Sequence, residues 1–153
     1  MIPKFRAWLK KEKRMIPVDI LDLKNKKVHW LLELEDKNYW FDYIVLMQST
    51  GLKDKNGKEI FERDIVKYEG CDTLFQVVYE LGAWTLVGLR NDDIPYDKLP
   101  RCNEDDEWWG CQCDNVVSLF ELVWNQEMPY EGYLDFEIVG NMYENPELLE
   151  CDN

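Results

Sequence analysis

The sequence predicts a mainly-β protein built from two small lobes. Turn-forming residues recur at short intervals along most of the chain, which is the spacing of an all-β protein. The segments between these turns are rich in β-branched and aromatic residues, which lose side-chain freedom in helices and pack well on pleated sheets. With 153 residues, of which 46% are apolar, the chain is also long and apolar enough to bury a core.

The first predicted lobe covers residues 1–50 and consists of short strands. The strands expected in it are Phe5–Trp8, Val18–Leu23, Val28–Leu34 and Tyr39–Met47. The polar segment 24–27, between the second and the third of these strands, predicts a hairpin turn. A second polar segment, Glu35–Asn38, is expected to form the next turn.

The second predicted lobe covers residues 51–135 and is expected to be an SH3-like barrel. It opens on the pair Asn56–Gly57, which supplies the positive φ angles of a tight turn. The strands expected after it are Ile65–Tyr68, Phe75–Tyr79 and Trp84–Leu89. An acidic turn before the first of them is typical of such barrels, and Asp64 is expected to hydrogen-bond within that turn. Residues 116–124 fit either a strand or a short helix.

A long acidic loop insertion is expected inside the second lobe, at residues 91–115. It holds two prolines and eight acidic residues against one lysine and one arginine. A long irregular segment inside a compact domain is usually a functional loop. The closing residues 136–153 are expected to add a strand and a short helical turn, because Asp135–Val139 alternates and Asn145–Pro146 has the pattern of a capped helix start.

The charges are unevenly distributed along the chain. Residues 1–27 hold nine Lys/Arg against three Asp/Glu, whereas residues 28–153 hold nine against 28. An acidic body repels phosphates at long range, which argues against a general nucleic-acid binder. The basic amino-terminal segment is expected to fold against this body and neutralise it.

The sequence offers little for catalysis. Its one histidine, His29, lies on an expected strand and is interpreted as a residue that packs there or points to solvent. Neither Ser49 nor Ser118 has the flanking glycines of a nucleophile elbow, and no glycine-rich phosphate loop is present. We therefore expect a protein that is not an enzyme and carries no cofactor.

The cysteines give a weak candidate for a metal site. Three of them lie within or beside the acidic loop: Cys102, Cys111 and Cys113. Zinc needs about four ligands, and the fourth would have to come from Cys71, His29 or Cys151. The total of five cysteines is odd and nothing in the sequence suggests export, so free reduced thiols are the expectation.

A pair of tryptophans is the candidate for contact with a partner. Trp108 and Trp109 follow the acidic residues Asp105, Asp106 and Glu107. Tryptophan dominates the energetics of both cores and interfaces, so the pair either folds back over the barrel or contacts another protein.

Three segments resemble the YopX family, small proteins that are encoded mainly by phages and prophages. They are Thr50–Phe61 with its continuation Glu62–Tyr68, the opening Lys4–Trp8, and the closing Glu137–Leu149. The match departs at Leu9, where the family often has an acid, at Arg63, where it usually has glycine, and across about residues 91–130. The resemblance covers nearly the whole chain and implies no known activity.

We therefore expect a non-catalytic accessory protein of a phage or prophage, in the bacterial cytoplasm. It would be a protein-binding module whose unknown partner is a protein, with the host as the candidate source; a homo-oligomer is also compatible with the sequence. The longest run without a charge, Tyr43–Leu52, is too short to cross a membrane. Two alternatives are an acidic nucleic-acid mimic that inhibits a host DNA-binding protein and, less favoured, a metal-dependent hydrolase.

Replacing residues 91–115 by a short Gly-Ser bridge is expected to leave a folded protein that no longer captures its main partner. The reason is that both flanks keep the family pattern, and binding residues concentrate in loops on a rigid scaffold. Thermal melting checks that the shortened protein is folded, and an affinity pull-down from bacterial lysate checks that it has lost its main partner. An unfolded product would place Trp108 and Trp109 in the core, and a folded product that keeps its partner would place the binding surface on the scaffold.

Overall fold

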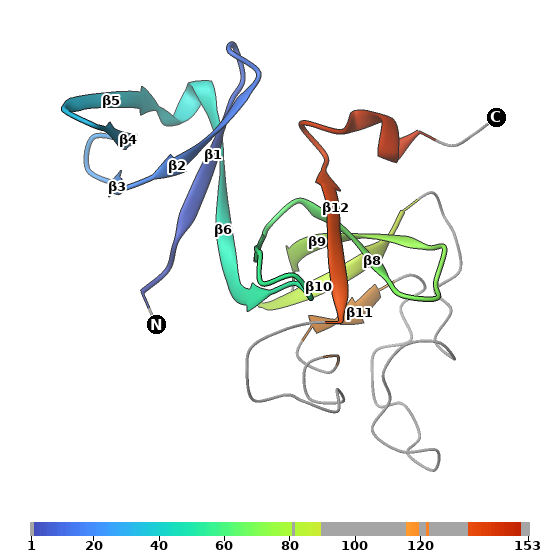
Figure 1. The fold of residues 1–153 in the computed structure, drawn as a ribbon. Helices are drawn as coiled ribbons and strands as arrows, with labels where there is room; N and C mark the ends of the chain where they lie inside the picture. Colours follow the sequence, from blue (N-terminus) through green and yellow to red (C-terminus); the bar gives the residue numbers. More distant parts are fainter. Residues whose placement is uncertain (1, 81, 90–115, 120–121, 123–134, 151–153) are drawn as a thin grey trace. The chain divides into compact units, whose positions relative to one another are not determined.

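The computed structural model of the chain describes residues 2–80, 82–89, 116–119, 122 and 135–150. The chain forms two compact units, Met1–Ser49 (unit 1) and Thr50–Asn153 (unit 2). The described residues form mainly short antiparallel strands (Figure 1), which confirms the mainly-β fold class.

Unit 1 contains strands of two small sheets and one helical turn. Its elements are β1 (Phe5–Leu9), β2 (Arg14–Val18), β3 (Ile20–Asp22), β4 (Lys27–Leu32), β5 (Glu35–Trp40), the 3-10 turn η1 (Phe41–Tyr43) and the first half of β6 (Ile44–Lys53). Strand β1 pairs with β2 on one side and β6 on the other. The other sheet has the order β3-β4-β5.

The expected turn at Glu35–Asn38 is wrong, because these residues belong to β5. The chain turns earlier, at Glu33, whose φ angle of 56° lies in the left-handed region. Leu32 and Glu35 then pair as the ends of a hairpin. The segment has the polar composition of a turn because β5 lies at the edge of its sheet, where polar side chains reach solvent.

Two other strand predictions in unit 1 need correction. The expected strand Val18–Leu23 is divided at Asp19, whose carboxylate accepts the Leu31 N–H at 2.7 Å. Val18 ends β2, which contains Pro17 at a sheet edge, where proline is tolerated. The expected strand Tyr39–Met47 is interrupted by η1.

Unit 2 is organised around a five-stranded antiparallel sheet. Its further elements are β7 (Glu59–Phe61), β8 (Asp64–Tyr68), β9 (Leu74–Glu80), β10 (Ala83–Gly88), β11 (Val116–Ser118), β12 (Phe136–Asn141) and the 3-10 turn η3 (Pro146–Leu149). The order of the sheet is β11-β10-β9-β8-β12, so the last strand in sequence pairs with β8. The three strands expected before residue 90, the closing strand and the short helical turn are confirmed. The SH3-like barrel and the acidic loop stay predictions, since residues 90–115 lie outside the described part of the chain.

The open choice between strand and helix at residues 116–124 has a mixed outcome. Val116–Ser118 is a strand, while Leu119 and Leu122 are helical and fully buried. The remaining residues of this segment lie outside the described part of the chain.

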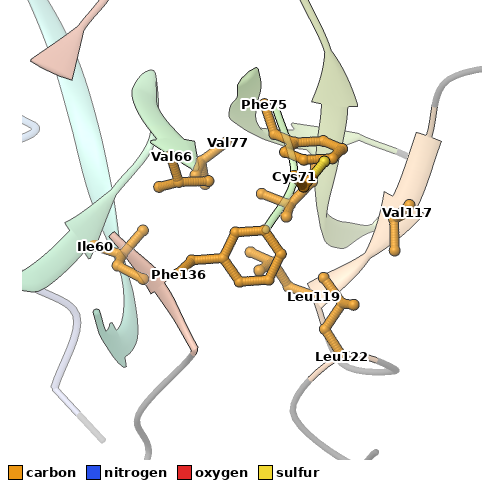
Figure 2. Packing of buried hydrophobic residues seen from close by; sticks show 10 residues of the cluster. Ile60, Val66, Cys71, Phe75, Val77, Val117, Leu119, Leu122 and Phe136 are labelled. Atoms are coloured by element: carbon orange, nitrogen blue, oxygen red, sulfur yellow. The ribbon is translucent and has the colours of Figure 1, made fainter. Parts of the chain in front are cut away.

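The core of unit 2 centres on Phe136 of β12. Figure 2 shows its ring among apolar side chains from β7 to β11. The ring lies 5.9 Å from that of Phe75, edge to face, and 5.1 Å from that of Tyr68. Partial burial of Tyr68 raises the pKa of its phenol. The strand farthest along the chain therefore supplies a central core side chain.

A buried aspartate, Asp54, joins the turn that opens unit 2 to β12. One carboxylate oxygen accepts the backbone N–H groups of Asn56 and Lys58, at 2.9 and 2.8 Å. The other accepts the N–H of Ile138, at 3.2 Å. Asp54 is only 1% exposed, so its buried carboxylate depends on these three backbone donors for hydrogen bonds.

Lys55 adds two contacts between the same turn and β12. Its N–H donates to the carbonyl of Phe136 at 2.9 Å, and its ammonium lies 3.1 Å from the carboxylate of Glu137. The contact with Glu137 raises the pKa of Lys55. The turn thus occupies the edge of β12 that faces away from β8.

Two further signature residues bond to the backbone around β7. The hydroxyl of Thr50 donates to the carbonyl of Ile60 at 2.9 Å and accepts the N–H of Leu52. The carboxylate of Asp64 accepts the N–H of Phe61 at 2.9 Å, as expected from the sequence. Both Thr50 and Asp64 are buried.

In the closing segment Glu137–Leu149, the conformation after β12 depends on Gly140, Asn141 and Asn145. The side-chain oxygen of Asn141 accepts the N–H groups of Tyr143 and Glu144. That of Asn145 accepts the N–H of Asn141 at 3.3 Å, so it points back toward β12. The expectation that the Asn145 side chain caps the helical turn is therefore wrong, since it makes no capping hydrogen bond there. A Cβ on Gly140 would lie 2.5 Å from the Asn145 oxygen, so any other residue at this position would displace the Asn145 side chain.

Asp54→Ala is expected to lower the free energy of unfolding by about 3 kcal/mol, because it removes the one side chain that accepts three backbone N–H groups from two distant segments. Urea denaturation followed by circular dichroism measures this loss. Asp22→Ala is the matched control: Asp22 also accepts a backbone N–H in a turn, from Asn25 at 2.9 Å, but in an exposed position. Equal losses in the two variants would contradict the structural role of Asp54.

Gly140→Ala is expected to destabilise the protein by about 2 kcal/mol, because the new methyl group displaces the Asn145 side chain. The measurement is a double-mutant cycle with Asn145→Ala. If the two side chains compete for one space, the double variant loses less stability than the sum of the single variants. Strict additivity would show that the Asn145 side chain is not what excludes a Cβ at position 140.

Candidate functional site

Most of the site residues predicted from the sequence lie outside the part of the chain that the structure describes. The weak metal candidates and the candidate partner-contact residues lie outside the described residues; they are Cys102, Cys111, Cys113, Asp105, Asp106, Glu107, Trp108 and Trp109. These assignments stay predictions.

The three candidates for a fourth zinc ligand differ in their surroundings. Cys71 is buried in the core of unit 2, and His29 lies on β4 in unit 1. Cys151 lies outside the described residues. Within the described ranges, no group of three or more His, Cys, Asp or Glu side chains could hold a metal ion.

His29 forms a contact across the β4–β5 hairpin. Its Nδ1 lies 2.9 and 3.0 Å from the two carboxylate oxygens of Asp36. His29 pairs with Asn38 in the register, so Asp36 is its diagonal neighbour on β5. The sequence-based interpretation of His29 as a strand residue is confirmed.

The side of the β3-β4-β5 sheet that carries His29 is called the outer face here. Alternation along β4 directs Val28 and Trp30 into the core, and the residues between and beside them to the outer face. The cross-strand register then places eight side chains on this face: Ile20, Asp22, Lys27, His29, Leu31, Asp36, Asn38 and Trp40. Three of these are apolar and about half exposed: Ile20 (48%), Leu31 (51%) and Trp40 (50%).

Trp40, at the end of β5, has a cation above its ring. The ammonium of Lys27, its cross-strand partner, lies 4.0 Å from the ring centroid. Such a contact is favourable by about 0.5–1 kcal/mol at an exposed site. It keeps the indole ordered while half of it stays open to solvent.

A hollow of about 390 Å³ lies beside Trp40. Its lining comes from the β1–β2 hairpin, from β5 and from η1: Leu9, Lys11, Glu12, Asn38, Tyr39, Trp40 and Tyr43. We call it the β5 hollow. Lys10 holds two of these elements together, because its N–H donates to the carbonyl of Tyr43 at 3.0 Å and its ammonium donates to that of Asp42 at 2.9 Å. The Tyr43 side chain remains 64% exposed.

The two units carry opposite net charges. Unit 1 holds ten Lys/Arg and seven Asp/Glu, and unit 2 holds eight and 24. The β5 hollow thus belongs to the basic unit, although Glu12 lies in its lining. A cationic surface favours anionic partners during diffusional encounter.

Sequence reasoning missed the β5 hollow because it placed a turn at Glu35–Asn38. A signal was nevertheless present in the aromatic cluster Tyr39–Tyr43, which holds four aromatic residues in five positions. A strand that alternates between core and solvent cannot bury all of them, so some must lie at a surface.

Comparison with known proteins begins with solved structures. The crystal structure of protein EF1440 from Enterococcus faecalis is 27% identical, with a TM-score of 0.51, and the match covers 98% of this chain and 99% of that one. The crystal structure of YopX from Bacillus subtilis is 17% identical, with a TM-score of 0.54, over 96% of this chain and 98% of that one. At 17% identity this second likeness shows the fold alone. No curated protein matches the chain.

No helix among the described residues is long and apolar enough to span a membrane. The family described as YopX protein matches residues 4–150, which is nearly the full length, and the chain therefore belongs to the YopX family.

Proposed function

We propose that this chain is a non-catalytic protein-binding module of a phage or prophage, which acts in the bacterial cytoplasm and contacts its partner through unit 1. The observation that carries the proposal is the half-exposed Trp40 beside the β5 hollow, with the exposed Tyr43 in the same lining.

The aromatic side chains favour a protein partner. Tryptophan and tyrosine contribute most to interface energetics, because they bury a large area and lose little side-chain freedom. Here Trp40 is held from one side by Lys27, and η1 is held by Lys10, so an incoming partner meets ordered side chains. An ordered surface lowers the entropic cost of binding.

The net charge of the chain argues against a nucleic acid as the partner. The whole chain carries a net charge of −13, which repels the dense phosphates of a nucleic acid at long range.

A second contact region is proposed from the sequence alone. It comprises Trp108 and Trp109 with the acidic residues Asp105, Asp106 and Glu107, which combine aromatic area with charges that steer a partner. The loop replacement described above separates its contribution from that of the β5 hollow.

An acidic nucleic-acid mimic is the alternative function. It is favoured by the excess of 16 acidic over basic residues in unit 2, which would attract a basic DNA-binding protein. Such a complex depends steeply on salt and is displaced by DNA, whereas binding through an aromatic anchor in unit 1 does not.

A photo-activated cross-linking residue at Tyr43 is expected to capture a protein from a bacterial lysate treated with nuclease. Trp40→Ala should weaken that capture roughly 30-fold, which corresponds to an anchor of about 2 kcal/mol. The same cross-linker at Tyr79, an exposed tyrosine of unit 2, is the matched control. Cross-links that arise equally at both positions, or that persist in Trp40→Ala, would contradict unit 1 as the binding surface.

A further inference from the structure

Strand β5 lies at one edge of the β3-β4-β5 sheet. Its register with β4 runs without interruption from Trp40 to Glu35, and the backbone bond from Phe41 N–H to the Lys26 carbonyl, at 2.9 Å, fixes which residues face β4. In an antiparallel ladder the residues alternate between bonding to the neighbour and facing away from it. Tyr39 therefore bonds to β4, while Asn38 and Trp40 direct their N–H and C=O groups outward from the sheet.

The outward backbone of β5 coincides with the β5 hollow. Asn38 and Trp40 both line it, together with Leu9 and Tyr43 from other elements. A strand laid along β5 would alternate its own side chains, with one set beside Trp40 on the outer face and the other set toward the hollow. No strand among the described residues pairs with this edge, so the edge offers backbone hydrogen bonds, and the hollow offers a place for an apolar side chain.

The other sheet edges in the described ranges are less suited to an added strand. Pro17 removes an N–H donor from β2, and β3, β7 and β11 are only three residues long. The outer edge of β12 is already bonded to the turn at Asp54 and Lys55. Natural proteins usually cover or interrupt edges in these ways, so the longer open edge of β5 is a feature to be explained.

The charge around this edge selects the kind of strand. Lys11 lies in the lining and Lys27 above Trp40, within a unit that has three more basic than acidic residues. Glu12 and Asp36 oppose this locally, and Asp36 is itself in contact with His29. These local charges cancel, so the net charge of +3 of unit 1 decides, and an acidic segment approaches this unit more readily than a basic one.

We propose that β5 receives an extended acidic segment of another protein as an added strand, with an apolar side chain of that segment in the β5 hollow. This inference rests on the proposed function and states the chemical class of the partner. Backbone pairing would supply the affinity of the complex, and alternate side chains of the added strand would supply its specificity.

The test uses the full chain and an array of synthetic peptides of about ten residues, which vary in charge and in the position of one large apolar residue. The peptides that bind best are expected to be acidic with an apolar residue near the centre. Fluorescence anisotropy then compares each of them with the same peptide N-methylated at alternate backbone nitrogens. Because N-methylation removes strand pairing and keeps the side chains, affinity should fall roughly tenfold or more.

Variants at Asn38 provide the matched controls on the protein side. Asn38→Pro removes an outward N–H at an edge position, where proline is tolerated, and should abolish peptide binding while the circular dichroism spectrum is retained. Asn38→Ala removes the same side chain but keeps the N–H, so it should bind the peptides at least tenfold more tightly than Asn38→Pro does. The N-methylated peptides also test whether binding needs backbone pairing, and they do so without any change in the protein. The test therefore remains decisive even if Asn38→Pro fails to fold.

Four results would overturn the inference: no peptide that binds better to the parent chain than to Trp40→Ala, no preference for acidic peptides, insensitivity to N-methylation, or a dimer in analytical ultracentrifugation that Asn38→Pro dissociates. The last result would assign the edge to a second copy of this chain. If the cross-link from Tyr43 persists while the peptide test fails, the proposed function stands and only the mode of binding is wrong. If that cross-link is absent, the proposed function itself fails.

Discussion

The fold of unit 2 depends on a single buried carboxylate, that of Asp54. It bonds to the turn in which it lies and to Ile138, 84 residues later in the chain. Strand β12 carries Phe136 into the core, and pairing with β8 fixes only one of its edges. The Asp54 turn fixes the other. A contact between such distant residues closes the unit, because it satisfies donors on both segments at once.

The residues that resemble the family signature bond to the backbone and so stabilise the fold. Thr50, Asp54 and Asp64 each bond to main-chain groups, and a Cβ on Gly140 would displace the Asn145 side chain. Arg63 has a φ angle of 69°, a conformation that glycine adopts without strain, which agrees with the glycine that the resemblance leads one to expect at this position. Shared signatures thus mean a shared scaffold, and differences in function belong to the surfaces between them.

The sequence predicts the fold best where strands alternate and turns carry their own chemistry, as at Asp64 and at Gly57, which has the expected positive φ angle of 81°, whereas Asn56 does not have one. It fails at β5, because the polar residues of an edge strand have the composition of a turn. The candidate site was missed for the same reason. The β5 hollow can be recognised only when the register of the β4–β5 hairpin and the position of η1 are known. Long-range contacts such as that of Asp54 with Ile138 leave no local pattern.

The outer edges of β12 and β5 are protected from unspecific strand pairing in different ways. Along β12, β-branched and aromatic residues would be prone to aggregate if their backbone groups were open to other chains, and the Asp54 turn covers them. Along β5, the edge is open but begins with three charged residues, Glu35, Asp36 and Lys37. Charges on an edge strand discourage indiscriminate pairing. The charged start of β5 therefore limits unspecific pairing at the edge that remains accessible.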